Sequence, residues 1–141
     1  MYEDFYGRCQ KAIDDNREHI EMLGLITDQQ KLANFYGMCD LFCVPSRTDC
    51  FPSVQIESLL CGTPLVTTDI PGAREVVKVT GMGRLVEPRN SKALAEGLVR
   101  VLSDPAPYIK TPEEVRAVFS LERTVTEYEQ LLESMAVRNG R

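Results

Sequence analysis

The sequence contains no tryptophan, a single histidine (His19) and no Cys-X-X-Cys pair. An odd number of cysteines argues against a disulfide framework. We therefore predict buried, reduced thiols at the five cysteines, which are Cys9, Cys39, Cys43, Cys50 and Cys61. One histidine without a cluster of cysteines or carboxylates gives no metal site, so we expect a protein that needs neither a metal nor another cofactor.

Long apolar runs and an excess of positive charge are also missing. No run reaches the roughly 18 residues of a membrane span, and the charged segment after Met1 does not look like a signal peptide. The formal net charge of −5 argues against nucleic acid or an anionic membrane as the main partner. We therefore expect a cytoplasmic protein without a transmembrane segment.

What the sequence does contain is a regular alternation of short apolar runs and helical patterns. The runs predict strands at 20–25, 40–44, 64–68 and 83–86, the second of them ended by Pro45. Helices are expected at 2–14, from Thr27 to about Cys39, from Pro52 to Cys61, at 72–77, after Asn90 or Ser91, at 111–119 and after Ser120. This rhythm predicts an α/β fold, a Rossmann-like parallel sheet with helices on both faces.

The 141 residues suffice for one domain with a real core. We expect residues 1–104 to form the sheet-containing unit and residues 105–141 to form a linker and C-terminal helices that pack on it. The last helix carries an apolar stripe that should serve this packing, formed by Leu121, Val125, Tyr128, Leu132 and Met135. A similar side of the second helix holds Leu32, Phe35 and Tyr36.

Two acidic residues, Asp49 and Glu57, flank the predicted start of a helix. Ligands of open parallel sheets bind beyond the carboxyl ends of the strands, and helix N-termini attract anions. The amides of Ser53 and Val54 would therefore bind a phosphate. Glu57 lies roughly 6–8 Å further along the helix, which suits a ribose, and Asp49 would face a sugar at the other end. This order matches a nucleotide diphosphate sugar.

Simpler interpretations remain open. Asp49 is compatible with a turn and Glu57 with a solvated helix surface. The segment 67–69 fits a strand end, and 71–75 fits a tight turn with a solvated Arg74–Glu75 pair. Arg47 and Arg74 do not have a spacing that guarantees contact with a pyrophosphate, so we expect its counter-charge to come from elsewhere.

The motifs themselves resemble a known family. The motifs that carry the resemblance are LGLI (23–26), LANFY (32–36), CDLFCVPS (39–46), FPSVQIE (51–57), CGTPLV (61–66), GAREVV (72–77) and GRLVEP (83–88). With them, residues 20–104 resemble the donor-binding half of retaining GT-B glycosyltransferases of family four, and Phe119, Ser120 and Tyr128 resemble its C-terminal helix.

The resemblance implies transfer of a sugar from a nucleotide diphosphate sugar with retained anomeric configuration, usually without an essential metal. It implies that Asp49 binds the donor sugar, that the backbone from Phe51 and Pro52 to Ser53 and Val54 meets sugar and phosphate, and that Glu57 binds the ribose. A further residue, Ile26, would lie near the base.

Two departures from the family pattern stand out. The family's first acidic residue is usually Glu, whereas Asp49 is one methylene shorter. The Gly-Arg loop, the phosphate-binding cation, two central strands and the acceptor-binding domain are not visible before Met1. We therefore expect a fragment with weak donor affinity and no transferase activity of its own. Its acceptor would be a glycan, lipid or small molecule bound by the N-terminal domain, and a lipid acceptor would place the enzyme at a membrane surface.

Other functions compatible with the pattern are a related GT-B nucleotide-sugar epimerase and a non-catalytic module that keeps the fold. A flavodoxin-like signalling domain would need an acidic phosphorylation site, and no acidic cluster follows the predicted strand at 20–25.

Overall fold

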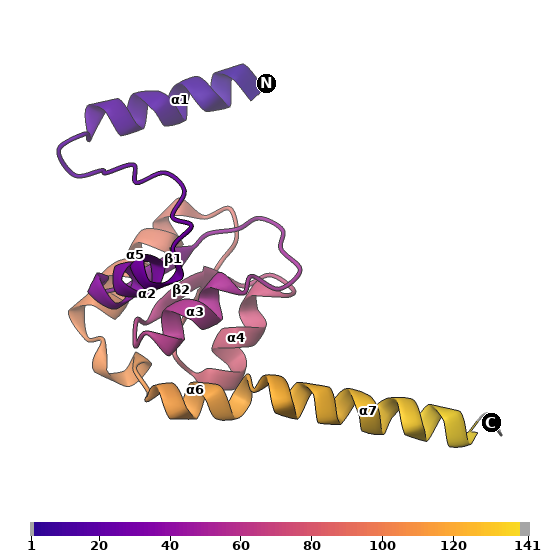
Figure 1. The fold of residues 1–141 in the computed structure, drawn as a ribbon. Helices are drawn as coiled ribbons and strands as arrows, with labels where there is room; N and C mark the ends of the chain where they lie inside the picture. The colour runs from indigo at the N-terminus through magenta and orange to yellow at the C-terminus, as the bar shows by residue number, and fades with distance from the viewer. Residues whose placement is uncertain (1, 139–141) are drawn as a thin grey trace.

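The computed structural model describes residues 2–138, and the side chains of residues 5–137. Along the chain its elements are α1 (Tyr2–Asp15), α2 (Gln29–Met38), β1 (Phe42–Val44), α3 (Val54–Leu60), β2 (Leu65–Thr68), α4 (Ala73–Thr80), β3 (Gly83–Val86), α5 (Ser91–Ser103), the 3-10 helix η1 (Ala106–Tyr108), α6 (Pro112–Val118) and α7 (Leu121–Arg138). Figure 1 shows a body formed by α2 to α6, from which α1 and α7 extend.

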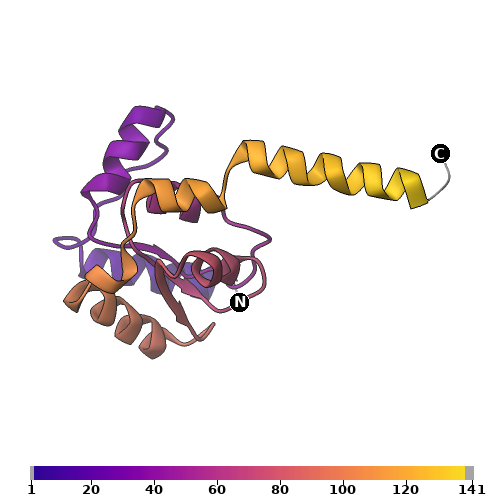
Figure 2. The same cartoon turned by 90° about the horizontal axis from the view of Figure 1, so that it is seen from below.

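The three described strands form one parallel sheet in the order β1-β2-β3. The central strand β2 is buried along its whole length. Because neighbouring residues of a strand face opposite sides, Leu65 and Val66 enter two different cores. Leu65 packs with residues of α3, α4 and α6, whereas Val66 packs with Val86 and with Val101 of α5. Figure 2 shows these helices on the two sides of the sheet, which confirms the predicted α/β fold.

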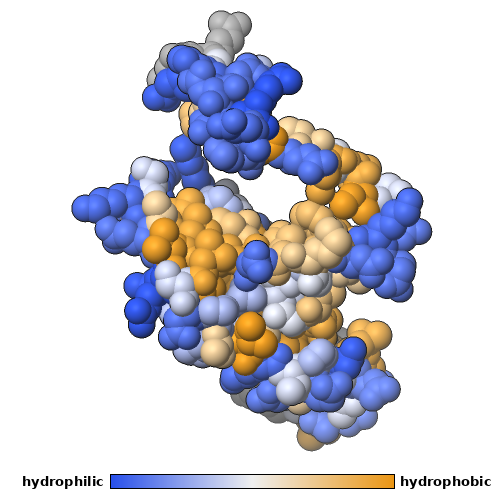
Figure 3. Space-filling model, turned by 90° about the vertical axis from the view of Figure 1, so that its left-hand side faces the viewer, coloured by the Kyte–Doolittle hydropathy of each residue, from blue (hydrophilic) through white to orange (hydrophobic). Residues whose placement is uncertain are grey.

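The predicted strand at 20–25 is wrong for this structure. The segment is irregular, and its side chains are exposed, Met22 by 75% and Leu25 by 89%. A strand needs a neighbour to pair its backbone N–H and C=O groups, and no described residue pairs with this segment. Figure 3 shows orange apolar residues along this segment, which stands away from the body.

Helix starts agree with the sequence patterns to within one or two residues. Asp28, not Thr27, caps α2, because its carboxylate accepts a hydrogen bond from the Lys31 amide at 2.8 Å. The third helix begins at Val54 rather than Pro52. Asn90 caps α5 and Thr111 caps α6, which agrees with the predicted helix starts, and the structure adds Glu114, whose side chain completes a capping box with Thr111.

The apolar stripe of α7 does not pack on the body. Its five predicted residues are between 48% and 77% exposed, and α7 extends into solvent in Figures 1 and 2. Helical spacing reveals that a helix has an apolar face but not what covers it, which is why the packing expectation failed. By contrast, Tyr108 of η1 and Val115 of α6 do contact the two cores. The boundary near residue 104 remains a prediction.

Candidate functional site

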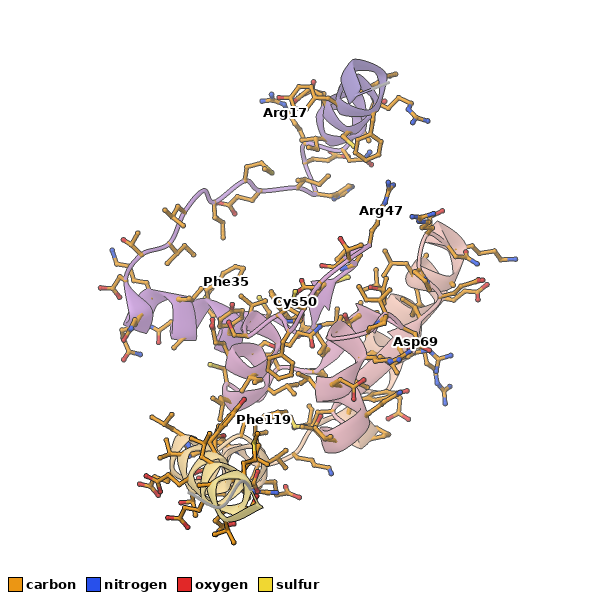
Figure 4. The ribbon with its side chains drawn as sticks, turned by 90° about the vertical axis from the view of Figure 1, so that its right-hand side faces the viewer. Arg17, Phe35, Arg47, Cys50, Asp69 and Phe119 are labelled. Carbon is orange, nitrogen blue, oxygen red and sulfur yellow. The ribbon has the colours of Figure 1, made fainter. Side chains whose placement is uncertain are left out.

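The loop that follows β1 carries the first acidic residue. Asp49 is half-buried, and the Ser46 hydroxyl donates a hydrogen bond to its Oδ2 at 3.4 Å. The Thr68 hydroxyl, at the end of β2, donates to the Ser46 carbonyl oxygen. This contact joins the loop to the carboxyl end of the neighbouring strand, which is the region where parallel sheets bind ligands. In Figure 4 the loop runs from Arg47 past Cys50 toward α3.

The loop leads directly into α3. Ser53 is its N-cap residue, with helical dihedral angles and no capping hydrogen bond from its side chain. The first α3 amides with an acceptor belong to Gln55, which donates to the Pro52 carbonyl oxygen, and to the residues after it. Within the described residues, the amides of Ser53 and Val54 have no acceptor. Two unpaired amides at the start of a helix are suited to an anion.

The second acidic residue is held by a tyrosine from α2. Glu57 is half-buried, and the Tyr36 hydroxyl donates a hydrogen bond to its Oε2 at 3.2 Å. Burial, followed by the charge of Glu57 and this hydrogen bond, raises the pKa of Tyr36 to about 12. The phenol therefore stays protonated and remains a donor throughout the physiological pH range. Both side chains line a cavity of about 510 Å³ between α2, α3 and α6.

The structure brings Asp49 and Glu57 onto one loop–helix unit but not into one cavity. Gln29 and Arg116 line the cavity together with Glu57, whereas Asp49 does not. The two carboxylates also have different hydrogen-bond donors, Ser46 for Asp49 and Tyr36 for Glu57. That Asp49 and Glu57 bind the two ends of one ligand therefore remains a prediction.

The other predicted contacts have different surroundings. The Phe51 ring is 47% exposed and packs at a tilt against the Phe119 ring, with centroids 6.3 Å apart. Pro52 is buried, so only its backbone is available to a ligand. Ile26 is half-buried in the segment just before α2. The sugar, phosphate and base contacts expected of these residues remain predictions.

The two candidate cations from the sequence, Arg47 and Arg74, do not line the cavity that holds Glu57. Arg74 is bound to Asp69 at 3.4 Å and to Glu75 at 3.3 Å, which agrees with the simpler interpretation of that turn. Arg47 lines a second cavity, of about 230 Å³, together with Arg89. Arg89 and Arg116 could not be singled out from the sequence, because solvent-exposed arginines on a loop and a helix are common.

The cysteines are free, as predicted, but their burial was not predicted correctly. Cys9 and Cys50 are exposed, and the other three are partly buried. Burial raises the pKa of Cys43, and burial together with Glu57 raises the pKa of Cys61. Over residues 2–138, no group of three or more His, Cys, Asp or Glu residues is arranged to hold a metal ion. No helix in that range has the length and hydropathy needed to cross a membrane.

Comparison with known proteins gives a family and several relatives. The family model "Glycosyl transferases group 1" matches residues 7–118. An uncharacterized glycosyltransferase of Methanocaldococcus jannaschii is 30% identical over 103 residues, which are 70% of this chain and 29% of that protein. A D-inositol 3-phosphate glycosyltransferase of Thermobispora bispora is 36% identical over 77 residues, 55% of this chain and 18% of that protein.

Solved structures extend the likeness to almost the whole chain. Sucrose-phosphate synthase from Thermosynechococcus elongatus superposes with a TM-score of 0.76 at 29% identity, over 93% of this chain and 34% of its own. HepE of Anabaena, in complex with UDP, gives 0.71 at 25% identity, over 96% of this chain and 37% of its own. The chain thus spans about a third of the length of these structures.

Proposed function

The chain belongs to the glycosyl transferases group 1 family, and from that premise we propose that it is the donor-binding part of a longer retaining glycosyltransferase. The donor is a nucleotide diphosphate sugar, and the acceptor is a glycan, lipid or small molecule bound by another part of the protein. The observation that carries the proposal is the continuous unit of Asp49, two unpaired amides and Glu57 at the carboxyl end of β1. HepE, a solved relative, was crystallised with UDP and glucose, which supports the ligand class.

In this proposal each part of the unit binds one part of the donor. Asp49 accepts hydrogen bonds from the sugar hydroxyls, assisted by the backbone of Phe51 and Pro52. The Ser53 and Val54 amides bind the pyrophosphate, because their N–H groups are unpaired and the helix dipole favours an anion. Glu57 accepts hydrogen bonds from the ribose, and Ile26 lies beside the base.

The chemistry assigned to this chain is positioning and charge stabilisation. A donor held at its sugar, phosphates and ribose presents its anomeric carbon in a fixed orientation, so the acceptor attacks on the side of the leaving group with retention. The amides stabilise negative charge that grows on the departing diphosphate. Neither Asp49 nor Glu57 acts as a nucleophile here, and the additional positive charge for the diphosphate comes from the rest of the enzyme.

The test uses the longer protein that carries this segment, with Asp49→Asn and Glu57→Gln. These changes keep the side-chain size and remove the carboxylate, so sugar transfer should fall roughly 100-fold or more. Matched controls are Asp104→Asn and Glu133→Gln, two exposed positions away from the loop–helix unit. Unchanged sugar transfer in both test variants would mean that this segment is a non-catalytic module of the longer protein. Epimerised nucleotide sugar as the sole product would identify an epimerase instead.

A second measurement concerns the 141-residue chain alone. We expect weak nucleotide-sugar binding and no transfer, because Arg74 is paired with Asp69 and Glu75 and Arg47 lines a different cavity from Glu57. Isothermal titration calorimetry with the chain measures this directly. Tight binding by the chain would show that its own residues form a complete donor site.

A further inference from the structure

Tyr36 is fixed at three points. The Thr63 hydroxyl donates a hydrogen bond to the Tyr36 carbonyl oxygen at 2.6 Å. The Phe42 ring of β1 meets the Tyr36 ring edge to face, with centroids 5.1 Å apart. The side chain is only 4% exposed, so packing restricts its rotamers. A residue held in this way presents its hydroxyl group at a defined place.

That hydroxyl is directed at Glu57, from a residue 21 positions earlier in the chain. Among the described residues, Glu57 accepts this one side-chain hydrogen bond and takes part in no ion pair. An ionised carboxylate has about four acceptor positions, so most of its capacity remains available on the cavity side. The donor–acceptor distance of 3.2 Å leaves room for the contact to shorten when a ligand binds.

Without such a contact, a glutamate on a helix surface samples several rotamers, and a ligand has to restrict them on binding. Fixing the side chain beforehand removes part of this entropic cost. The carboxylate of Glu57 is held at one oxygen by a donor that is itself fixed. Its other oxygen is then oriented for a ligand hydroxyl.

We propose that Tyr36 is a positioning residue for nucleotide binding, which acts by orienting the Glu57 carboxylate toward the two ribose hydroxyls. This inference rests on the proposed function, since it needs Glu57 to meet the ribose. Tyr36 itself does not touch the donor. The competing explanation is that Tyr36 only fills the core between α2 and β1, and then its hydroxyl would have no specific link to the ribose.

The two explanations differ in a nucleotide that lacks the ribose hydroxyls. The test uses the longer protein with Tyr36→Phe, which removes one oxygen and keeps the ring. UDP, GDP and ADP are first compared by calorimetry, and the tightest is carried forward with its 2′,3′-dideoxy form. We expect Tyr36→Phe to weaken binding of the ribonucleotide about 5- to 20-fold and binding of the dideoxy form less than about 2-fold.

A second variant makes the test independent of folding effects. In a Glu57→Gln background, Tyr36→Phe should have almost no further effect on ribonucleotide affinity, because both residues act through one contact. The matched control is Tyr128→Phe, at a tyrosine that is 63% exposed on α7, and it should bind like the wild type. Thermal melting of each variant verifies that it is folded.

The outcomes separate this inference from the proposed function. Equal weakening of both nucleotide forms by Tyr36→Phe, or an additive effect in the Glu57→Gln background, would mean a structural role and overturn the inference. No effect of Tyr36→Phe beside a strong effect of Glu57→Gln would overturn it as well, while the ribose site would stand. If none of the three nucleotides binds, or Glu57→Gln changes nothing, the proposed function fails and the inference with it.

Discussion

Gly72 lies directly against the carbonyl oxygen of Cys50, so closely that a Cβ atom at position 72 would overlap it. The same Cβ would lie 2.6 Å from the carbonyl oxygen of Asp49. Gly72 also has φ +86°, a conformation that L-residues with a side chain rarely adopt. The start of α4 and the loop that carries Asp49 therefore occupy positions that only glycine permits.

The substitution Gly72→Ala should destabilise the chain by roughly 1–3 kcal/mol, because it adds a steric overlap and a strained φ. It should also weaken donor binding in the longer protein, since the Asp49 loop has to move. Urea unfolding measures the first effect and calorimetry the second. The matched control is Gly37→Ala within α2, where an added Cβ meets nothing within 4 Å. This control should stabilise the chain by up to about 1 kcal/mol, because alanine favours a helix more than glycine does. Wild-type stability of the Gly72 variant would contradict the close approach.

A buried hydrogen-bonded chain connects α3 with the sheet. Gln55 is fully buried, and its Nε2 donates to the Thr67 hydroxyl at 2.9 Å, which donates in turn to the Val44 carbonyl oxygen at 2.9 Å. The Oε1 of Gln55 has no described partner. Thr67→Val should cost roughly 1–3 kcal/mol, because it leaves the rest of the Gln55 amide unpaired as well.

The same change should cost less in a Gln55→Leu background, where no buried amide is left to satisfy. Urea unfolding of the two single variants and the double variant gives the coupling free energy. Strictly additive effects would mean that the two side chains do not depend on each other for their hydrogen bonds.

The sequence revealed those parts of the fold that depend on local patterns. Leu65 to Thr68 was recognisable as a strand because both of its faces are buried, and Thr111 as a helix start because a capping residue is a local signal. The part that Glu114 plays in the same cap was not recognised. Asp49 and Glu57 were recognisable because they follow a strand and flank a helix start. Tyr36 was not, since its partner is 21 residues away and its ring resembles any other apolar position of α2.

The sequence patterns failed where the structure depends on a neighbouring strand to pair with or on another element that covers an apolar face. The segment at 20–25 has the composition of a strand but no described neighbour, and the stripe of α7 has the spacing of a packed face but no described cover. Both errors concern contacts between distant parts of a chain, which periodicity cannot supply.

The exposed stripe gives a direct prediction about stability. Leu132→Gln on α7 should change the free energy of unfolding of the 141-residue chain by less than about 0.5 kcal/mol, because Leu132 is 63% exposed. Leu59→Ala in α3 should cost about 2–5 kcal/mol, because Leu59 is completely buried in the core. Both are measured by urea unfolding. A large loss in the Leu132 variant would show that α7 packs on the body in solution.

The last prediction concerns high pH. The pKa of Tyr36 is raised from 10.0 to about 12 in the folded chain. Below pH 10 the phenol is protonated in both the folded and the unfolded state, and its contribution is fully present. Between about pH 10 and 12 the unfolded state releases this proton while the folded state keeps it, so stability falls as pH rises.

The effect amounts to about 1.4 kcal/mol per pKa unit, or 2–3 kcal/mol near pH 12. Tyr36→Phe removes the titrating group, so its stability should decline less steeply above pH 10 than that of the wild type. Urea unfolding at a series of pH values from 9 upward compares the two. Cys43, whose pKa is also raised, is present in both proteins and cancels in the difference, whereas Cys61 is one of the groups whose charge raises the pKa of Tyr36 and so belongs to the measured effect. Parallel curves for the two proteins would mean that the Tyr36 phenol ionises as easily in the folded chain as in the unfolded one, which its burial and the neighbouring Glu57 carboxylate should prevent.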